Sequence, residues 1–183
     1  MLDCVLAKRN LSHFKKITLK AVVAALTVAA AVILPMIVHL AYGSIGGGVF
    51  MPMYIPVIFG AAFMGKAWGS AIALLSPLVS FAVTSVISNP MPSVQKLPFI
   101  MAELLVFALV CGSFSKKIAN NVSFTFIAVL LSQIAGRSTL VVLNLAFGSV
   151  SAALTQVYNG IFALILQLAL IPLLMLLIKK FQK

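Results

Sequence analysis

Two side chains that could bind a ligand, or each other, through charge lie inside apolar segments of this chain. Glu103 lies in the run 97–113, and Arg137 lies in the run 122–147. A charge without a partner at the centre of a membrane costs on the order of 2.5–3.5 kcal/mol on insertion scales. The two residues are therefore expected either to form a structural ion pair or to face a ligand cavity, and both interpretations stay open.

A polar stripe accompanies the arginine. Gln133, Arg137 and Asn144 recur at spacings of four and seven residues, which places them on one face of a helix. In an otherwise apolar helix, this face should point into the protein. There it would line a ligand cavity or join helices through hydrogen bonds.

Three more polar side chains are predicted near the outer membrane interface. Tyr54 fits either the aromatic belt of that interface or the wall of a pocket, and His39 fits an interfacial histidine. Asn159 stands near the start of the last apolar segment, at a similar level. All three are included as candidate substrate-binding residues.

One segment comes close to a nucleotide-binding loop. Residues 60–67, GAAFMGKA, depart from the pattern G-x-x-x-x-G-K-[ST] at the last position, where Ala67 replaces the hydroxyl residue. The residues before it are predicted to form an apolar helix, whereas the loop needs a strand. Asp3 and Glu103 are the chain's only acids, so no second acidic motif is available. We expect no nucleotide binding, and any ATP hydrolysis would belong to another polypeptide.

The sequence has no pattern of an enzyme, a metal site or a resident cofactor. Cys4 and Cys111 are far apart and belong to no C-x-x-C motif, so both are interpreted as plain thiols. There is no convincing nucleophile–base pair, acid pair or His/Cys cluster. We therefore expect no catalytic residue, no metal ligand and no cofactor.

Composition indicates that the chain lies in lipid. Hydrophobic residues make up 63% of its 183 residues and charged residues 8%, against roughly 45–50% and about 25% in soluble domains. The net charge of +11 does not indicate nucleic acid, because the basic residues stand between apolar blocks and do not gather on one polar surface.

Six apolar segments are predicted to be transmembrane helices of an all-α protein, a single domain over residues 1–183 that begins with a basic segment, 1–16. Their predicted ranges are 17–42, 53–64, 67–88, 97–113, 122–147 and 152–177. A span needs about 20 apolar residues, and the first run reaches that length. The apolar core of a signal peptide has only about 7–15 residues. The second run is too short to cross unless its glycine-rich approach is enclosed by protein. The stretches SIGGGVFMP and SKKIANN are predicted to be loops.

The distribution of charge predicts the orientation. Apart from Arg137 inside the fifth segment, all the lysines and arginines except Lys96 fall on one side of a six-helix arrangement. The positive-inside rule then places both termini in the cytoplasm. We expect a multi-pass protein of the cell membrane, surrounded by lipid.

The first segment carries a strip of small residues. Ala21, Ala25 and Ala29 repeat every four residues, which lets another helix approach closely. The strip either packs within the chain or docks a second membrane subunit, and the sequence leaves both interpretations open.

Several short motifs occur in an order that carries a resemblance. They are Met51-Pro52-Met53-Tyr54-Ile55-Pro56-Val57, Ser76-Pro77-Leu78, Pro90-Met91-Pro92, Glu103 with Phe107 and Gly112, and Gly136-Arg137. Together with the six spans, they resemble the substrate-binding S components of energy-coupling factor (ECF) transporters, which import vitamins in prokaryotes. In one branch of that family, the first motif reads L-P-M-H-I-P-V, and the next two are an S/P-rich helix end followed by G-M-P. The motif around the glutamate reads E-L-x-x-Y-G-x-x-x-G, and the last motif is G-R.

The chain departs from that branch at three positions that would touch ligand. Tyr54 stands in place of His, Phe107 in place of Tyr, and Asn89 stands near the usual Gly. Phe107 and Asn89 therefore join the candidate substrate-binding residues. The branch includes members proposed for cobalamin precursors, and the departures leave the identity of the vitamin or precursor open.

The resemblance implies a mechanism and partners. A vitamin-like ligand would bind from outside, in a cavity capped by the loop after the first helix and lined by the fourth to sixth helices. The loaded protein would dock on a membrane coupling subunit with two ATPases, using the alanine strip, and release the ligand inside a prokaryotic cell. The alternative is an autonomous small channel or ion-coupled carrier acting as a homo-oligomer, although a proton-coupled carrier usually needs more buried acids.

Overall fold

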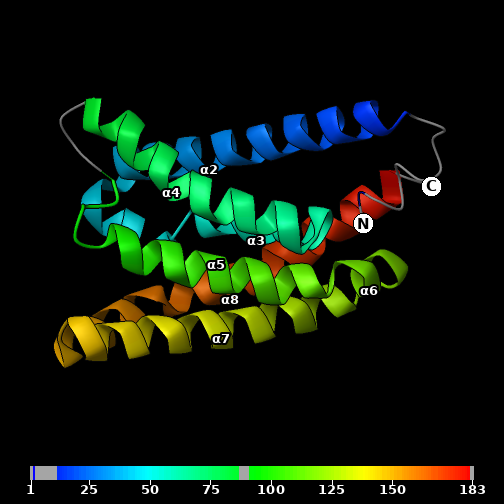
Figure 1. The fold of residues 1–183 in the computed structure, drawn as a ribbon. Helices are drawn as coiled ribbons and strands as arrows, with labels where there is room; N and C mark the ends of the chain where they lie inside the picture. Colours follow the sequence, from blue (N-terminus) through cyan, green and yellow to red (C-terminus); the bar gives the residue numbers. More distant parts are fainter. Residues whose placement is uncertain (1, 3–11, 87–90, 182–183) are drawn as a thin grey trace.

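The protein folds as a bundle of helices, seen in a computed structural model that describes residues 2, 12–86 and 91–181 (Figure 1). Within those residues there is no strand. The helices are α2 (His13–Phe50), α3 (Tyr54–Met64), α4 (Lys66–Val86), α5 (Leu97–Ser113), α6 (Ser115–Asn120), α7 (Phe124–Phe147) and α8 (Val150–Phe181). The predicted all-helical fold is confirmed.

Four helical segments in the described part of the chain are long and apolar enough to cross a membrane. They are His13–Gly43, Lys66–Val86, Phe124–Phe147 and Ala153–Lys180. The helices α3 and α5 are apolar but shorter, with 11 and 17 residues. This arrangement is compatible with a transmembrane protein, and the count of six crossings stays a prediction.

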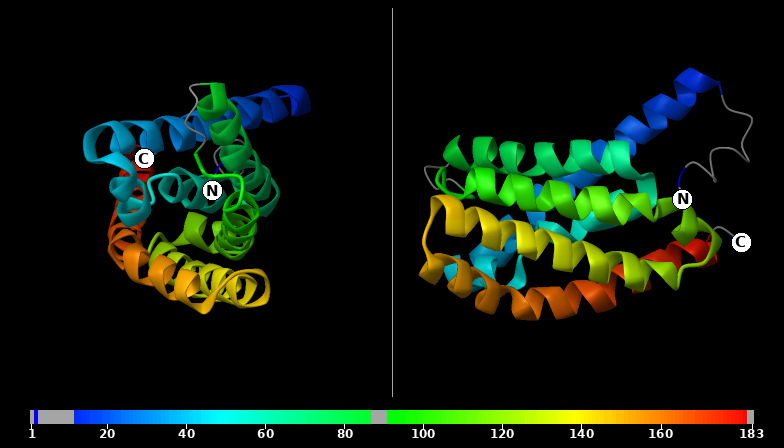
Figure 2. Two further views of the ribbon diagram at one scale, coloured as in Figure 1. Left: turned by 90° about the vertical axis from the view of Figure 1, so that its left-hand side faces the viewer. Right: turned by 60° about the horizontal axis from the view of Figure 1, so that its bottom comes forward.

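The short helix α3 lies inside the bundle. It packs against α2, α4, α5 and α8, and eight of its eleven residues are buried. Figure 2 shows the longer helices arranged around it. A helix too short to span is therefore enclosed by protein, which is the condition under which irregular backbone beside it is tolerated at membrane depth.

The approach to α3 differs from the prediction. The stretch SIGGGVFMP was expected to be a loop, yet α2 continues through it to Phe50. The helix is interrupted at Gly43, whose φ of 65° and ψ of −163° break the helical path. Glycine adopts such a positive φ without steric cost, so the break falls there and helical turns resume after it. The second predicted loop, SKKIANN, is also wrong in part, since α6 forms over most of it.

The described lysines gather at one end of the bundle, with one exception. The start of α2, the turn between α3 and α4, α6 and the end of α8 all lie at the right-hand end of Figure 1. Lys179 Nζ donates a hydrogen bond to the carbonyl of Asn120 (2.9 Å), which ties α8 to α6 there. Lys96 precedes α5 at the opposite end. We call the first of these the lysine end.

The outer surface of the long helices is apolar. Leu26 of α2, Ile134 of α7 and Ile165 of α8 are each more than half exposed. An apolar surface of this extent is not stable against water and needs a covering. Lipid covers such a surface without a partner protein, in agreement with the predicted environment.

Glycines let α3 approach its neighbours. Gly65, with a φ of 91°, forms the tight turn into α4. A Cβ at Gly69 would lie 2.7 Å from the Cα of Ala61, and one at Gly112 would lie 2.8 Å from the backbone nitrogen of Lys66. These contacts are too short for any side chain, so α4 approaches α3, and α5 approaches the turn between α3 and α4, only because both positions are glycine.

We therefore predict that Gly69→Ala destabilises the fold. The added methyl group meets backbone, which cannot rotate away as a side chain can, so α3 and α4 must separate. The free energy of unfolding should fall by about 1–3 kcal/mol, the usual cost of overpacking. Denaturant unfolding of the detergent-solubilised protein measures it.

The matched control is Ser85→Ala, which lies on the exposed side of the same helix and should change stability little. Equal stability of the two variants would contradict the close packing of α3 against α4.

Candidate functional site

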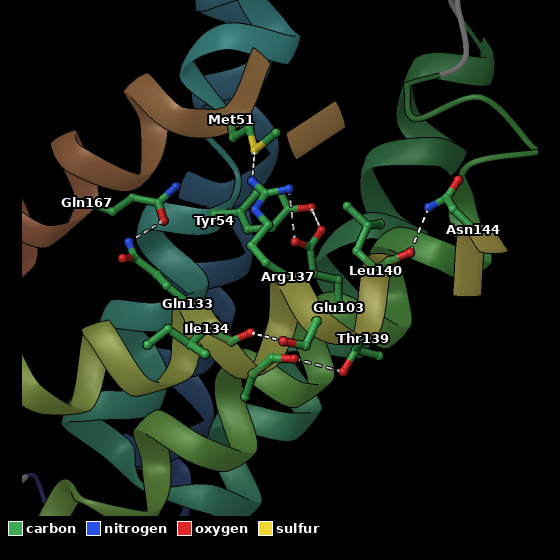
Figure 3. Close-up of polar contacts among 12 residues, drawn as sticks. Met51, Tyr54, Glu103, Gln133, Ile134, Arg137, Thr139, Leu140, Asn144 and Gln167 are labelled. Carbon is green, nitrogen blue, oxygen red and sulfur yellow. Dashed lines mark hydrogen bonds and ion pairs between the residues drawn. The ribbon is translucent and has the colours of Figure 1, made fainter. Parts of the chain in front are cut away.

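The two intramembrane charges meet. Arg137 Nη1 of α7 lies 3.1 Å from Glu103 Oε1 of α5, and the side chains are only 9% and 1% exposed. Glu103 lies in the first half of α5, which begins opposite the lysine end, and Figure 3 shows the pair beside Tyr54 at the start of α3. The charges are thus withdrawn from lipid by facing each other inside the protein.

Tyr54 joins the pair from the first turn of α3. Its hydroxyl donates a hydrogen bond to Glu103 Oε2. Its ring lies edge-on to that of Phe107, with 5.6 Å between ring centroids, and the Arg137 guanidinium lies 5.8 Å from the Tyr54 centroid. Because Tyr54 is only 6% exposed, its interpretation as part of an interfacial aromatic belt is wrong, and it belongs to the buried cluster.

Glycines bring the helices that carry these residues into contact. A Cβ at Gly136 would lie 2.7 Å from the ring of Phe107, so α5 and α7 approach through this position. A Cβ at Gly160 of α8 would lie 2.6 Å from Arg137 Nη2. The bare backbone of α8 therefore forms one wall against the guanidinium.

Met51 covers the remaining edge of the guanidinium. Its Sδ lies 2.6 Å from Arg137 Nη2. Met51 has a φ of 42°, in the left-handed region that residues other than glycine rarely adopt. Such a conformation costs on the order of 1–3 kcal/mol and persists only where surrounding contacts hold it. The backbone before α3 thus directs this thioether onto the arginine.

Two glutamines extend the polar cluster between α7 and α8. Gln133 Nε2 donates to the carbonyl of Leu164 (2.9 Å) and lies 3.4 Å from Gln167 Oε1. Gln167 is fully buried and was not predicted. A signal for it exists, because it is the one polar side chain in the otherwise apolar stretch 161–177.

Several buried polar atoms in this cluster lack a hydrogen-bond partner in the structure. They are Glu103 Oε1, Arg137 Nε, Arg137 Nη1 and Gln167 Nε2. Glu103 and Arg137 are within ion-pair distance, but the geometry between Nη1 and Oε1 is not that of a hydrogen bond. A buried donor or acceptor left unpaired costs about 1–3 kcal/mol, so the cluster retains unused capacity to bind.

The other candidate residues are not shown in contact with the ion pair. Asn144 is buried, but its amide nitrogen donates to the carbonyl of Leu140 in its own helix (2.8 Å). His39 is partly exposed on α2, and Asn159 is exposed on α8. Asn89 lies outside the described residues. For these four positions, substrate binding stays a prediction that no contact with the Glu103–Arg137 pair supports.

The near-match to a nucleotide-binding loop is a helix end. Residues 60–64 are the last residues of α3, and no strand precedes them. Among the residues that the structure describes, no three His, Cys, Asp or Glu side chains are close enough to hold a metal ion. Cys111 is a buried free thiol, whereas Cys4 lies outside the described part.

The alanine strip lines a groove between α2 and α4. Ala21, Ala25 and Ala29 are exposed, and with Trp68 and Leu75 they border an apolar groove of about 580 Å³. The strip is therefore not filled by another helix of this chain. It is open to lipid or to a partner within the membrane.

Comparisons with protein-family models, with curated proteins and with solved structures found no match to this chain.

We predict strong coupling between the two charges. Glu103→Gln or Arg137→Gln leaves one buried charge without its partner, which should lower the free energy of unfolding by about 3–5 kcal/mol. The double variant leaves no charge, so it should lose less than the sum of the two single losses. Denaturant unfolding in detergent measures all three. Additive losses would show that the two side chains do not interact.

We also predict that Gly160→Ala disturbs the site and spares the fold. The new methyl group would collide with Arg137 Nη2 and with Met51 Cε, at 2.6 and 2.7 Å. Both atoms end flexible side chains, which can move without separating the helices. With methionine methyl groups labelled by ¹³C, the Met51 resonance should shift while the unfolding midpoint stays close to that of the unchanged protein.

The control for this variant is Ser151→Ala, an exposed position of the same helix, which should leave the Met51 resonance in place. An unshifted Met51 signal in Gly160→Ala would mean that the thioether does not lie against α8.

Proposed function

We propose that this chain is the substrate-binding membrane subunit of an ECF-type importer for a vitamin or vitamin precursor. The observation that carries the proposal is the buried cluster of Glu103, Arg137 and Tyr54, with hydrogen-bonding atoms that no protein group satisfies. A purely structural ion pair gains from satisfying all its atoms, whereas a binding site keeps donors and acceptors for its ligand.

The place of the cluster supports binding from outside. Under the positive-inside rule the lysine end faces the cytoplasm, and the cluster then lies toward the external side of the bundle. In this orientation the chain crosses the membrane six times, with α3 and α5 as the short crossings. Enclosure of α3 by α2, α4, α5 and α8 supports a crossing of only 11 residues.

The groove between α2 and α4 is the proposed docking surface for the coupling subunit. Small side chains on an exposed helix face let a second membrane helix approach closely. The three alanines lie in the first half of α2, on the part nearer the lysine end. A coupling subunit bound here would reach the cytoplasmic side, where two ATPase partners supply the energy.

Purification of the tagged chain from its native host, in mild detergent, tests this function. We expect a membrane coupling subunit and two ATPases to co-purify. Ala25→Trp fills the groove and should remove these partners. Leu26→Trp is the matched control, because Leu26 is exposed on the neighbouring position outside the groove, and it should keep them.

A different outcome would reject the proposal. If the purified chain forms a homo-oligomer that transports alone in vesicles, it is an autonomous channel or carrier. Equal retention of partners by Ala25→Trp and Leu26→Trp would reject the groove as the docking surface and leave the rest of the proposal standing.

A further inference from the structure

The unsatisfied atoms of the buried cluster define the kind of group that would complete it. Three are donors, namely Arg137 Nε, Arg137 Nη1 and Gln167 Nε2, and one is an acceptor, Glu103 Oε1. A ligand that satisfies them must offer an acceptor to the guanidinium and an N–H or O–H to the carboxylate. The two groups must lie side by side, because the carboxylate and guanidinium atoms are 3.1 Å apart.

Charge balance limits the ligand further. Glu103 is the only acidic residue in the described part of the chain, and its charge is balanced by Arg137. An anionic group entering beside them would leave an uncompensated negative charge in an enclosed site, and a cation would leave a positive one. Burial of an unbalanced charge is strongly unfavourable, so an uncharged group fits best.

The aromatic surfaces favour a flat group. Tyr54 and Phe107 meet edge to face, and the guanidinium plane lies beside the Tyr54 ring. A planar group can lie against such surfaces with little loss of conformational entropy. An amide with its N–H beside its C=O, as in a lactam or cyclic ureide, combines planarity, neutrality and adjacent donor and acceptor.

Met51 covers one edge of the guanidinium, beside the donors that lack a partner. Its thioether sulfur contacts Arg137 Nη2, and a thioether is only a weak acceptor. A carbonyl oxygen is a stronger one. Methionine has three rotatable side-chain bonds and repacks readily, so a ligand can displace it without moving the helices.

We propose that the buried cluster at Glu103 and Arg137 selects an uncharged planar amide of the lactam or cyclic ureide type, which enters by displacing Met51. The carbonyl oxygen accepts from Arg137 Nη1, with Met51 displaced from the neighbouring Nη2, and the adjoining N–H donates to Glu103 Oε1. Gln167, in the same seam between α7 and α8, donates to a second acceptor of the ligand. This inference rests on the proposed function only in that both use this buried cluster.

Three probes of similar shape test it. They are isoquinolin-1-one, its N-methyl derivative, which lacks the N–H, and 1-naphthoate, which carries a charge. Binding to the purified full-length chain in detergent is measured by isothermal titration calorimetry. The lactam should bind about tenfold more tightly than either of the others. The N-methyl derivative lacks the hydrogen bond to the buried carboxylate, and 1-naphthoate adds an unbalanced charge.

Variants separate recognition from stability. Glu103→Gln leaves Arg137 as a single positive charge, so the preference should reverse and 1-naphthoate should become the best ligand. Met51→Ala removes the resident thioether and should strengthen binding of the lactam several-fold. Met51→Ala keeps the ion pair, so it tests the inference even if Glu103→Gln does not fold.

The inference is overturned if 1-naphthoate binds best to the unchanged protein, if N-methylation makes no difference, or if none of the probes binds saturably. These results are independent of the partner experiment. Lactam selectivity without co-purifying ATPases would contradict the proposed function and support this inference. Co-purifying ATPases without lactam selectivity would support the proposed function and contradict this inference.

Discussion

The contact between Glu103 and Arg137 is the constraint on which the rest of the structure depends. Neither charge is tolerable in lipid, so α5 and α7 must present them to each other within the bundle. Neither helix can slide along the other, because a shift of one turn would separate the carboxylate from the guanidinium. The pair therefore fixes the register of α5 against α7, and Tyr54, through its hydrogen bond to Glu103, fixes the start of α3 against both.

Small residues make this arrangement possible where charge alone could not. The ring of Phe107 lies on Gly136, and the guanidinium lies on Gly160, at distances that any Cβ would prevent. In lipid, no hydrophobic effect drives helices together, so close packing and hydrogen bonds must do so. Glycine at these contacts serves both needs, because it shortens the distance between helices and leaves room for a polar side chain beside them.

Much of this could be predicted from the sequence, for physical reasons. Two lone charges in apolar segments must find partners, which is why Glu103 and Arg137 could be singled out, and Gln133 followed from its spacing to the arginine. Apolar length predicted α4, α7 and α8 to within a few residues, whereas α2 continues beyond its predicted end at residue 42 to Phe50. The count of crossings could not be settled in this way, because α3 owes its stability to enclosure by other helices, a property of the whole bundle.

Other features were beyond reach of pattern alone. A methionine such as Met51 in an apolar sequence indicates only packing. Its contact with Arg137 depends on a backbone conformation that the sequence pattern does not indicate. Gln167 stands out as the one polar side chain of residues 161–177, but nothing in that segment indicates that it lies beside Gln133 of α7. The helical turns after Gly43 arise where glycines normally indicate a loop, and α6 forms where two lysines and two asparagines favour one. Each case depends on contacts with segments distant in sequence.

The short helix α3 connects the two surfaces that any transport role would use. Its first residue, Tyr54, contacts the ion pair, and its last turn leads through Gly65 into α4 beside Gly112 of α5. Along its length, Gly60 meets Ile72 of α4 and Thr27 of α2, and Ile72 also borders the groove that the alanines line. A ligand that displaces Met51 would act on the segment that leads directly into α3, and any movement of α3 would be felt by α2 and α4, which form the groove. The buried cluster and the groove are thus joined by one enclosed helix, which close glycine contacts hold against α2 and α4.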